Sequence, residues 1–225
     1  MERTTRSHHD AALNARTWDV IVSSRNPTPR PLDWLFRPAP GPGPELLGDV
    51  RGATVAELGC GQGRHLASLA ECGIDRGIGI DVSPVRLGDA AFTFADVEQV
   101  EWWLGDAVTT AAHLPDLDVA FSVFGAMWFA DPQDLLPVLA RRVRLGGRLV
   151  FSCLTRSPGM PEGRRQMLVR TGPARSMWTV RHMYSVSGWV RLLAEHGFTT
   201  DRVVRPTDPV NAFWGACVFA AHRYR

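Results

Sequence analysis

The stretch VAELGCGQGRHLASLAECGIDRGIGIDVSP, residues 55–84, decides the fold of this 225-residue chain. An apolar run of strand length leads into a turn in which Gly59, Gly61 and Gly63 are spaced GxGxG, and a run of helical character follows. A second apolar run then ends at Asp81. A short strand, a tight turn, a helix and another short strand are the elements of a parallel sheet that is covered by helices.

The same alternation continues along the chain and places the ligand site by topology. Strands are expected over residues 54–58, 77–82, 100–104, 117–123 and 148–153, and near 198–205 and 211–222. Helices are expected over 11–22 and 62–72, from Ser83-Pro84, from Asp131-Pro132 to Gly146-Gly147, and from Ser185 to Gly197. In such sheets the ligand crevice lies beyond the carboxyl ends of the strands.

Composition indicates a soluble enzyme-sized domain. Hydrophobic residues make up 45% of the chain and charged residues 21%, and no apolar run approaches the roughly 20 residues that span a bilayer. The first ten residues contain no apolar signal core, so we expect a cytoplasmic protein without a membrane partner. The four cysteines form no CxxC pair, and no metal site is expected.

Positive charge is concentrated in the C-terminal third of the chain. All 25 basic residues are arginine, and residues 148–205 hold 10 of them against 3 acids. From Arg156 to Arg181 there are six arginines and one glutamate. This run is either a solvated basic face or a recognition element for an acidic acceptor, because the guanidinium fork pairs well with carboxylate and phosphate groups.

The residues around the glycine turn argue against a dinucleotide. The nicotinamide and flavin fingerprint needs a third glycine where this chain has Arg64. Glu57, at the end of the first strand, would repel a pyrophosphate by about 3 kcal/mol at ~5 Å and an effective dielectric of ~20. A zwitterionic amino acid next to a sulfonium fits better, because its carboxylate can bind helix N–H groups and its ammonium can bind Glu57.

Two further carboxylates complete the pattern. Asp81 ends the second strand, where a carboxylate can accept both hydroxyls of a ribose. Asp106 ends the third strand and can accept a hydrogen bond from an adenine amino group. Three acids at three successive strand ends, together with the glycine turn, describe a nucleoside joined to a cationic amino acid, which is S-adenosylmethionine.

The sequence resembles class I S-adenosylmethionine-dependent methyltransferases of the small-molecule type over roughly residues 53–205. VAELGCGQGRHLASLA is similar to the first motif of that family, GIGIDVSPVRL to the second and EWWLGDA to the third. LDVAFSVFGAMWFADP, LLPVLARRVRLGGRLVFS and YSVSGWVRLLAEHGF are similar to later segments. The resemblance implies a Rossmann-like seven-stranded α/β sheet of order 3-2-1-4-5-7-6, with strand seven antiparallel and helices on both faces.

The resemblance also implies which residues line the cofactor site. They are Glu57, Gly59, Cys60, Gly61, Gly63, Asp81, Val82, Asp106, Ala107, Val123 and Phe124. One departure concerns the turn after strand four, where many relatives carry a serine-glycine pair and this chain has Val123 and Phe124. The Phe124 ring is expected to narrow the site near the methionine moiety.

The acceptor is expected to lie under two variable pieces of chain. The first is residues 1–52, an N-terminal lid and a proline-rich wrap anchored by Trp34, Leu35 and Phe36; residues 53–222 then form the methyltransferase domain. The second piece is a cap insertion at about 154–184. Candidate substrate-binding residues are Trp18, Trp128, Arg181, His182 and Tyr184, for each of which ordinary packing is the alternative. No catalytic residue is assigned, because methyl transfer needs a base only when the acceptor must lose a proton.

The most economical function is methyl transfer to an O, N or C atom of a small molecule, such as an acidic or aromatic natural-product intermediate, by a monomer or homodimer. One alternative is a cyclase or isomerase that keeps the fold without methylating. Another is a nucleic-acid or protein methyltransferase, but FSVFGAMWF lacks the proline-aromatic motif of base methyltransferases, and nucleic acid is not an expected partner. Glu57 and Arg64 disfavour a dinucleotide oxidoreductase.

Overall fold

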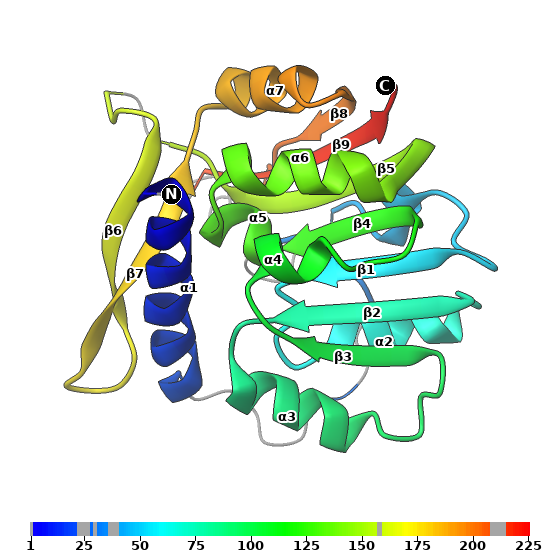
Figure 1. Ribbon diagram of the computed structural model, residues 1–225, viewed down its shortest axis with the longest axis horizontal. Coiled ribbons are helices and arrows are strands. Elements are labelled where there is room, and N and C mark those ends of the chain that lie inside the picture. The colour runs from blue at the N-terminus through cyan, green and yellow to red at the C-terminus, as the bar shows by residue number, and fades with distance from the viewer. Residues whose placement is uncertain (1, 22–27, 29–30, 36–40, 157–158, 208–214) are drawn as a thin grey trace.

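The computed structural model describes residues 2–21, 28, 31–35, 41–156, 159–207 and 215–225. A seven-stranded sheet forms the body, and a long helix and a two-stranded hairpin stand together at one end of it (Figure 1). The sheet contains β1 Thr54–Leu58, β2 Arg76–Asp81, β3 Val100–Leu104, β4 Leu117–Val123, β5 Val143–Leu154, β8 Phe198–Val204 and β9 Ala216–Arg223. The hairpin pairs β6 Gly163–Arg170 with β7 Ser176–Met183.

The strand order of the sheet is β3-β2-β1-β4-β5-β9-β8. Strands β1 to β5 pair in parallel, and β9 is antiparallel to both of its neighbours. This arrangement confirms the order 3-2-1-4-5-7-6 with an antiparallel last strand. Because the chain passes from β3 across to β4, the carboxyl ends of β1 and β4 flank a topological switch point, which is where ligands bind in such sheets.

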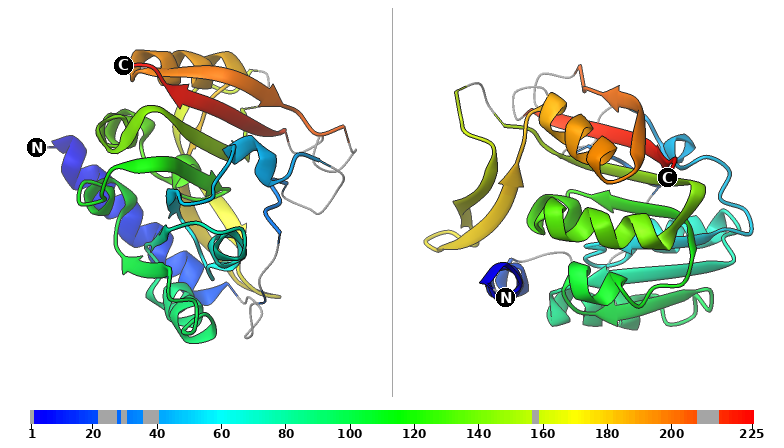
Figure 2. Two further views of the ribbon diagram at one scale, coloured as in Figure 1. Left: turned by 90° about the vertical axis from the view of Figure 1, so that its right-hand side faces the viewer. Right: turned by 45° about the horizontal axis from the view of Figure 1, so that its top comes forward.

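Helices cover both faces of the sheet (Figures 1 and 2). The helices are α1 Glu2–Val20, the 3-10 turn η1 Pro44–Leu47, α2 Arg64–Glu71, α3 Pro84–Thr93, α4 Ala107–Ala111, α5 Ala126–Phe129, α6 Pro132–Arg142 and α7 Val186–Glu195. Of these, α1 stands at the end of the sheet beside the hairpin. Successive residues of β1 enter different cores, because strand side chains alternate between faces. Val55 packs in the core that contains Leu66 of α2, whereas Ala56 packs in the core that contains Leu135 of α6.

The N-terminal helix is longer than the sequence indicated. A helix was expected over residues 11–22, but α1 begins at Glu2 and ends at Val20. The added turns are polar and show no apolar periodicity. Tertiary contacts account for the extension, since Asp10 forms an ion pair with Arg164 of β6.

The fifth strand also begins earlier than expected. The sequence predicted that α6 continues to Gly146-Gly147, whereas α6 ends at Arg142 and β5 starts at Val143. The pairing with β4 shifts register between Leu117 and Val119, and Gly146 has a φ of 77°. The two glycines therefore form an irregularity within the strand, a position where glycine is typical.

The chain before β1 lies against the sheet. Trp34 is fully buried, its indole N–H donates to the Gly43 carbonyl at 2.8 Å, and its ring contacts Phe121 of β4 edge-on. Leu35 is also buried, while Phe36 lies outside the described residues. Within the described parts of the chain, no helix is long and apolar enough to cross a membrane.

Candidate active site

A glycine turn joins β1 to α2 at the carboxyl edge of the sheet. Gly59 and Gly61 have φ values of 77° and 55°, which favour glycine. The N–H groups of Gly59 and Cys60 both donate to the Ile80 carbonyl, at 2.8 and 3.0 Å. A Cβ on Gly59 would lie 2.5 Å from the backbone nitrogen of Ala126, so the turn packs directly on the start of α5.

Gly63 ends the glycine turn where α2 begins. It is the N-cap residue of α2, with a φ of 74°. A Cβ at this position would come within 2.2 Å of the Trp102 ring on β3. Gly63 is not among the residues that line the cavity described below, although the resemblance placed it in the cofactor site.

Glu57 brings a buried carboxylate to the end of β1. Its side chain is 2% exposed, and Oε1 lies 3.4 Å from Nδ1 of His65. Oε2 has no hydrogen-bond partner among the described residues. Burial raises the pKa of this carboxyl, and the adjacent His65 opposes the rise. A buried acceptor without a donor is costly, so Glu57 is suited to binding a cationic group that enters the site.

Asp81 ties the glycine turn to the end of β2. Its Oδ2 accepts from the Gly61 N–H at 2.7 Å and its Oδ1 accepts from the Ser83 N–H at 2.8 Å. Burial raises the pKa of the Asp81 carboxyl, and these hydrogen bonds act in the opposite direction. Each carboxylate oxygen has two lone pairs, so both can accept one further hydrogen bond.

Asp106 occupies the end of the third strand as the N-cap of α4. Its Oδ1 accepts from the N–H groups of Val108 and Thr109 at 3.0 and 3.1 Å. Ala107 follows it and is buried. The N-cap fixes the carboxylate at the rim, where it lines the same cavity as Glu57 and Asp81.

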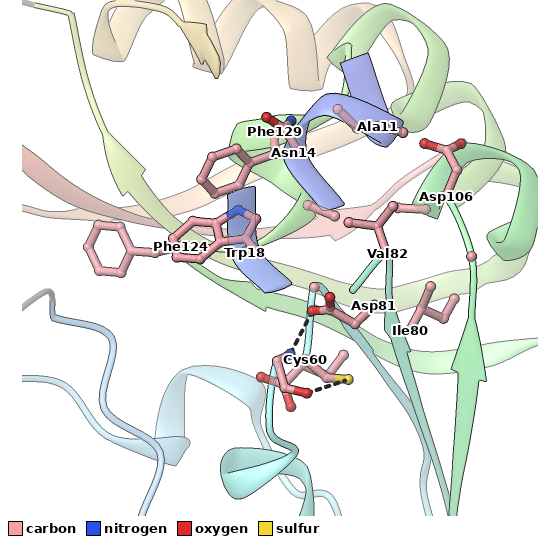
Figure 3. Close-up of a pocket in the computed structure, with 18 of the residues that line it drawn as sticks. Ala11, Asn14, Trp18, Cys60, Ile80, Asp81, Val82, Asp106, Phe124 and Phe129 are labelled. Carbon is pink, nitrogen blue, oxygen red and sulfur yellow. Dashed lines mark hydrogen bonds between the residues drawn. The ribbon is translucent and has the colours of Figure 1, made fainter. Parts of the chain in front are cut away.

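One cavity of about 730 Å³ connects these elements. Its walls come from the strand ends, from α1 and from the hairpin (Figure 3). The lining residues are Ser7, Asp10, Ala11, Asn14, Trp18, Glu57, Gly59, Cys60, Gly61, Gln62, Arg64, His65, Ile80, Asp81, Val82, Arg86, Gly105, Asp106, Ala107, Val123, Phe124, Gly125, Ala126, Phe129, Ala130, Asp131, Asp134, Arg164 and His182. Ten of the eleven predicted cofactor-site residues are among them, Gly63 being the exception.

Helix α1 forms one wall of the cavity. Trp18 meets Phe129 edge-on at 5.4 Å between ring centroids, and Arg86 of α3 lies over the Trp18 ring at 4.9 Å. Figure 3 shows Trp18 and Asn14 of this helix beside Phe129 and Phe124. Predicted residue Trp18 therefore lies in the cavity, where its ring contributes an aromatic wall.

The hairpin forms the facing wall through a cross-strand pair. Arg164 of β6 and His182 of β7 are directly opposite each other in the antiparallel register, and both line the cavity. Arg164 donates to both carboxylate oxygens of Asp10, at 2.6 Å each. His182 is 2% exposed, and its Nδ1 has no hydrogen-bond partner among the described residues.

Three predicted substrate-binding residues do not line the cavity. The Trp128 indole is buried, with its N–H directed to the Met183 sulfur at 3.1 Å. Arg181 lies over the Trp128 ring at 4.3 Å, and burial lowers the pKa of its guanidinium to about 10. Tyr184 packs against Trp189 of α7 at 5.2 Å. For these three residues the structure shows packing contacts, with Met183, Trp128 and Trp189 respectively.

Most arginines of the basic run, residues 156–181, contact groups of the protein itself. Arg165 and Arg170 donate to backbone carbonyls and do not line the cavity. Arg156 donates to the Met160 carbonyl and lies 3.5 Å from Glu162. Of the six arginines from 156 to 181, Arg164 is the one that lines the cavity, and Asp10 neutralises it.

Several lining residues had not been singled out from the sequence. They are Ser7, Asp10, Ala11, Asn14, Gln62, His65, Ile80, Arg86, Gly105, Gly125, Ala126, Phe129, Ala130, Asp131, Asp134 and Arg164. Asp131 could have been found, because it follows the carboxyl end of β4 and caps α6. The residues of α1 and β6 carry no such signal, since only tertiary packing brings them to the strand ends. The described residues include no cluster of side chains that could hold a metal ion.

Comparisons with known proteins relate the central part of this chain to methyltransferases. Residues 56–151 match a family described as "Methyltransferase domain". A trans-aconitate 2-methyltransferase of Azoarcus sp. (strain BH72) is 38% identical over 100 residues, which are 44% of this chain and 38% of that protein. A tRNA U34 carboxymethyltransferase of Aeromonas hydrophila is 27% identical over 70% of this chain and 48% of that protein. The chain thus spans less than half of the length of these curated relatives.

The fold has close counterparts among solved structures. A putative S-adenosylmethionine-dependent methyltransferase from Listeria monocytogenes superposes with a TM-score of 0.65 and 19% identity, over 80% of this chain and 95% of that one. This likeness shows the fold. The named acceptors of the two sequence relatives differ in kind, so the acceptor class has to be argued from the cavity itself.

Proposed function

We propose that this chain, which carries a class I S-adenosylmethionine-dependent methyltransferase domain, transfers the methyl group of that cofactor to a small-molecule acceptor. The observation that carries the proposal is a single cavity with two different ends. One end has the glycine turn and three strand-end carboxylates, and the other has aromatic and titratable side chains from α1 and the hairpin. The first end fits a nucleoside and the second leaves room for an acceptor.

The residues present fit S-adenosylmethionine. The partnerless Glu57 Oε2 can accept from the cofactor ammonium, and the absence of a side chain on Gly59 and Gly61 allows close backbone approach. Asp81 would accept from the ribose hydroxyls, and Asp106 from the adenine amino group. Val82, Ala107, Val123 and Phe124 would supply the apolar walls around them. When bound, the cofactor supplies an electrophilic methyl group on a sulfonium.

Helix α1 and the hairpin cover the cavity, and this cover favours a small molecule as the acceptor. Helix α1 is joined to the body through Ser83, whose hydroxyl donates to Asp19 at 2.6 Å. It is joined to the hairpin through Asn14 and Thr17, which bond the backbone of β7. We propose that helix α1 acts as a lid and that the hairpin belongs to the cap insertion, together excluding water during transfer. Such an enclosed site favours a small molecule over RNA or a folded protein.

The side chains of the cavity walls indicate which chemical class of acceptor fits. Trp18 and Phe129 contact each other edge-on and form an aromatic wall, against which an aromatic or otherwise apolar natural-product intermediate can pack. The arginine-rich run of residues 156–181 does not favour an acidic acceptor. Arg164 is the arginine of this run that lines the cavity, and Asp10 neutralises its charge. We therefore propose an aromatic acceptor without a carboxylate or phosphate group.

Two measurements test this function. Calorimetry should show that S-adenosylhomocysteine binds the chain while NADH does not. Incubation with methyl-labelled S-adenosylmethionine and a library of aromatic alcohols and amines should then release S-adenosylhomocysteine together with a labelled product. Binding of the cofactor without any labelled product, but with isomerisation or cyclisation of a library member, would instead support a non-methylating enzyme on this fold.

A further inference from the structure

The cavity is lined by a buried histidine, His182, with one ring nitrogen that the described residues leave unused. The side chain of His182 is nine-tenths or more buried and lines the cavity, and its Nδ1 has no hydrogen-bond partner among the described residues. A buried polar atom without a partner costs free energy in the empty protein. A ligand that donates a hydrogen bond to the imidazole would remove that cost.

The side chains around His182 influence the protonation state of its imidazole. From β6, Arg164 faces it, but this guanidinium is bound on two sides by Asp10 of α1. Asp131, the N-cap residue of α6, lines the same cavity and acts electrostatically on the imidazole. Burial lowers the pKa of His182, Asp131 and Asp10 act to raise it, and Arg164 acts to lower it. With burial as the largest of these influences, the imidazole is neutral at pH 7 and can accept a proton.

The charges at this end disfavour an anion. Asp131 lines the cavity and acts electrostatically on His182, and the charges of Asp10 and Arg164 compensate each other. An acceptor with a carboxylate or phosphate would meet the negative charge of Asp131. A hydroxyl or an ammonium group would be attracted to it.

We propose that the acceptor presents a hydroxyl or an amine to His182, and that His182 removes its proton as the methyl group is transferred. The inference rests on the proposed function and adds the proton acceptor and the charge class of the substrate. The acceptor oxygen or nitrogen forms a bond to the methyl carbon while the carbon–sulfur bond breaks. The electron pair of the broken bond stays on sulfur, which becomes a neutral thioether, and the acceptor proton passes to the imidazole.

The first test uses three probes of one shape and different charge. Benzyl alcohol, benzylamine and benzoate are titrated into the complex with S-adenosylhomocysteine, in protein labelled with ¹⁵N-histidine. We expect benzyl alcohol and benzylamine to shift the His182 ring resonances and to bind at least tenfold more tightly than benzoate. Tightest binding by benzoate, or no shift of His182 with any probe, would overturn the proposal.

The second test reverses the charge preference. Asp10→Asn removes the carboxylate that neutralises Arg164, so the free guanidinium should raise benzoate affinity at least tenfold and reduce benzylamine affinity. Asp116→Asn, an exposed acid outside the cavity, is the matched control and should change neither. An unchanged benzoate affinity in folded Asp10→Asn protein would contradict the assignment of charge.

The third test separates a catalytic role from a structural one. His182→Gln should keep S-adenosylhomocysteine affinity within twofold and should lower the rate of methylation at least a hundredfold. It should also abolish the fall in rate that the parent shows at acid pH, where His182 becomes protonated. His113→Gln, an exposed histidine outside the cavity, should behave like the parent. A His182→Gln enzyme with the parent pH profile would refute the role of His182, whereas a parent that does not bind S-adenosylhomocysteine would refute the proposed function itself.

Discussion

Asn14 of α1 bonds both backbone groups of Val180 in β7. Its Nδ2 donates to the Val180 carbonyl at 3.1 Å, and its Oδ1 accepts from the Val180 N–H at 2.8 Å. The side-chain amide thus takes the place of a neighbouring strand at the free edge of the hairpin, and Thr17 adds a bond to the Trp178 carbonyl. This contact joins helix α1 to the hairpin, and Figure 1 shows these two elements standing together at one end of the sheet.

Asn14→Ala tests the importance of this contact for stability. The substitution leaves a buried N–H and a buried carbonyl of Val180 without partners, so the free energy of unfolding should fall by about 1–3 kcal/mol. Urea denaturation followed by circular dichroism measures the change. His9→Ala on the exposed side of the same helix should change it by less than about 0.5 kcal/mol. Equal effects of the two substitutions would contradict the role given to Asn14.

Gly59→Ala tests the close approach of the turn to α5. The new Cβ would lie 2.5 Å from the Ala126 backbone nitrogen at a residue with φ of 77°, so we expect a loss of about 1–3 kcal/mol of stability. S-adenosylhomocysteine binding should fall below detection in calorimetry. Gly88→Ala in α3 is the matched control, because a Cβ there meets nothing within 4 Å. That helical substitution should instead add about 0.5–1 kcal/mol.

Glu57→Gln separates stability from cofactor binding. Burial raises the pKa of Glu57, so the folded chain binds this proton more tightly than the unfolded chain does. Stability is then lost as pH rises from the ordinary carboxyl pKa to the raised one, by at most about 1.4 kcal/mol per pH unit. The variant should lose this slope and be more stable than the parent above that range, yet bind S-adenosylhomocysteine about tenfold more weakly.

Urea denaturation at pH 5 and pH 8 measures the slope. Glu71→Gln, at the exposed end of α2, should keep the parent slope and the parent affinity. A Glu57→Gln protein with unchanged pH dependence would show that Glu57 ionises in the folded chain as it does in the unfolded one.

Asp81→Ala tests the second strand-end carboxylate. It removes the acceptor for the Gly61 and Ser83 N–H groups and the proposed acceptor for the ribose, so S-adenosylhomocysteine affinity should fall by about 1–3 kcal/mol. Asp116→Ala should leave calorimetric affinity unchanged. An Asp81→Ala protein with parent affinity would remove the ribose assignment.

The cofactor end of the site was predictable from local sequence. Glu57, Asp81 and Asp106 each follow an apolar run of strand length, and parallel strands carry their carboxyl ends to one edge. The register of the central strands then brings the three acids into one cavity. Gly63 was harder to place, because its contact with Trp102 depends on how β3 packs under α2.

The charge of the acceptor end could not be predicted from local sequence. The basic run of residues 156–181 was compatible with an acid-binding surface, but strand alternation directs Arg164 to the cavity and Arg165 away from it. Whether Arg164 could bind an anion then depended on Asp10, which is 154 residues away in sequence. The charge of an arginine is local information, whereas its neutralisation is a contact between distant segments.

The amino-acid sequence by itself determined the alternating α/β sheet, its strand order through the family resemblance, and the rim of carboxylates, because strand periodicity and glycine turns are local properties. Only the tertiary structure decided that α1 docks on the hairpin edge, that Trp128 and Arg181 pack together outside the cavity, and that Nδ1 of His182 meets no hydrogen-bond partner among the described residues. Those outcomes depend on long-range packing, in which side chains from distant segments compete for the same partners.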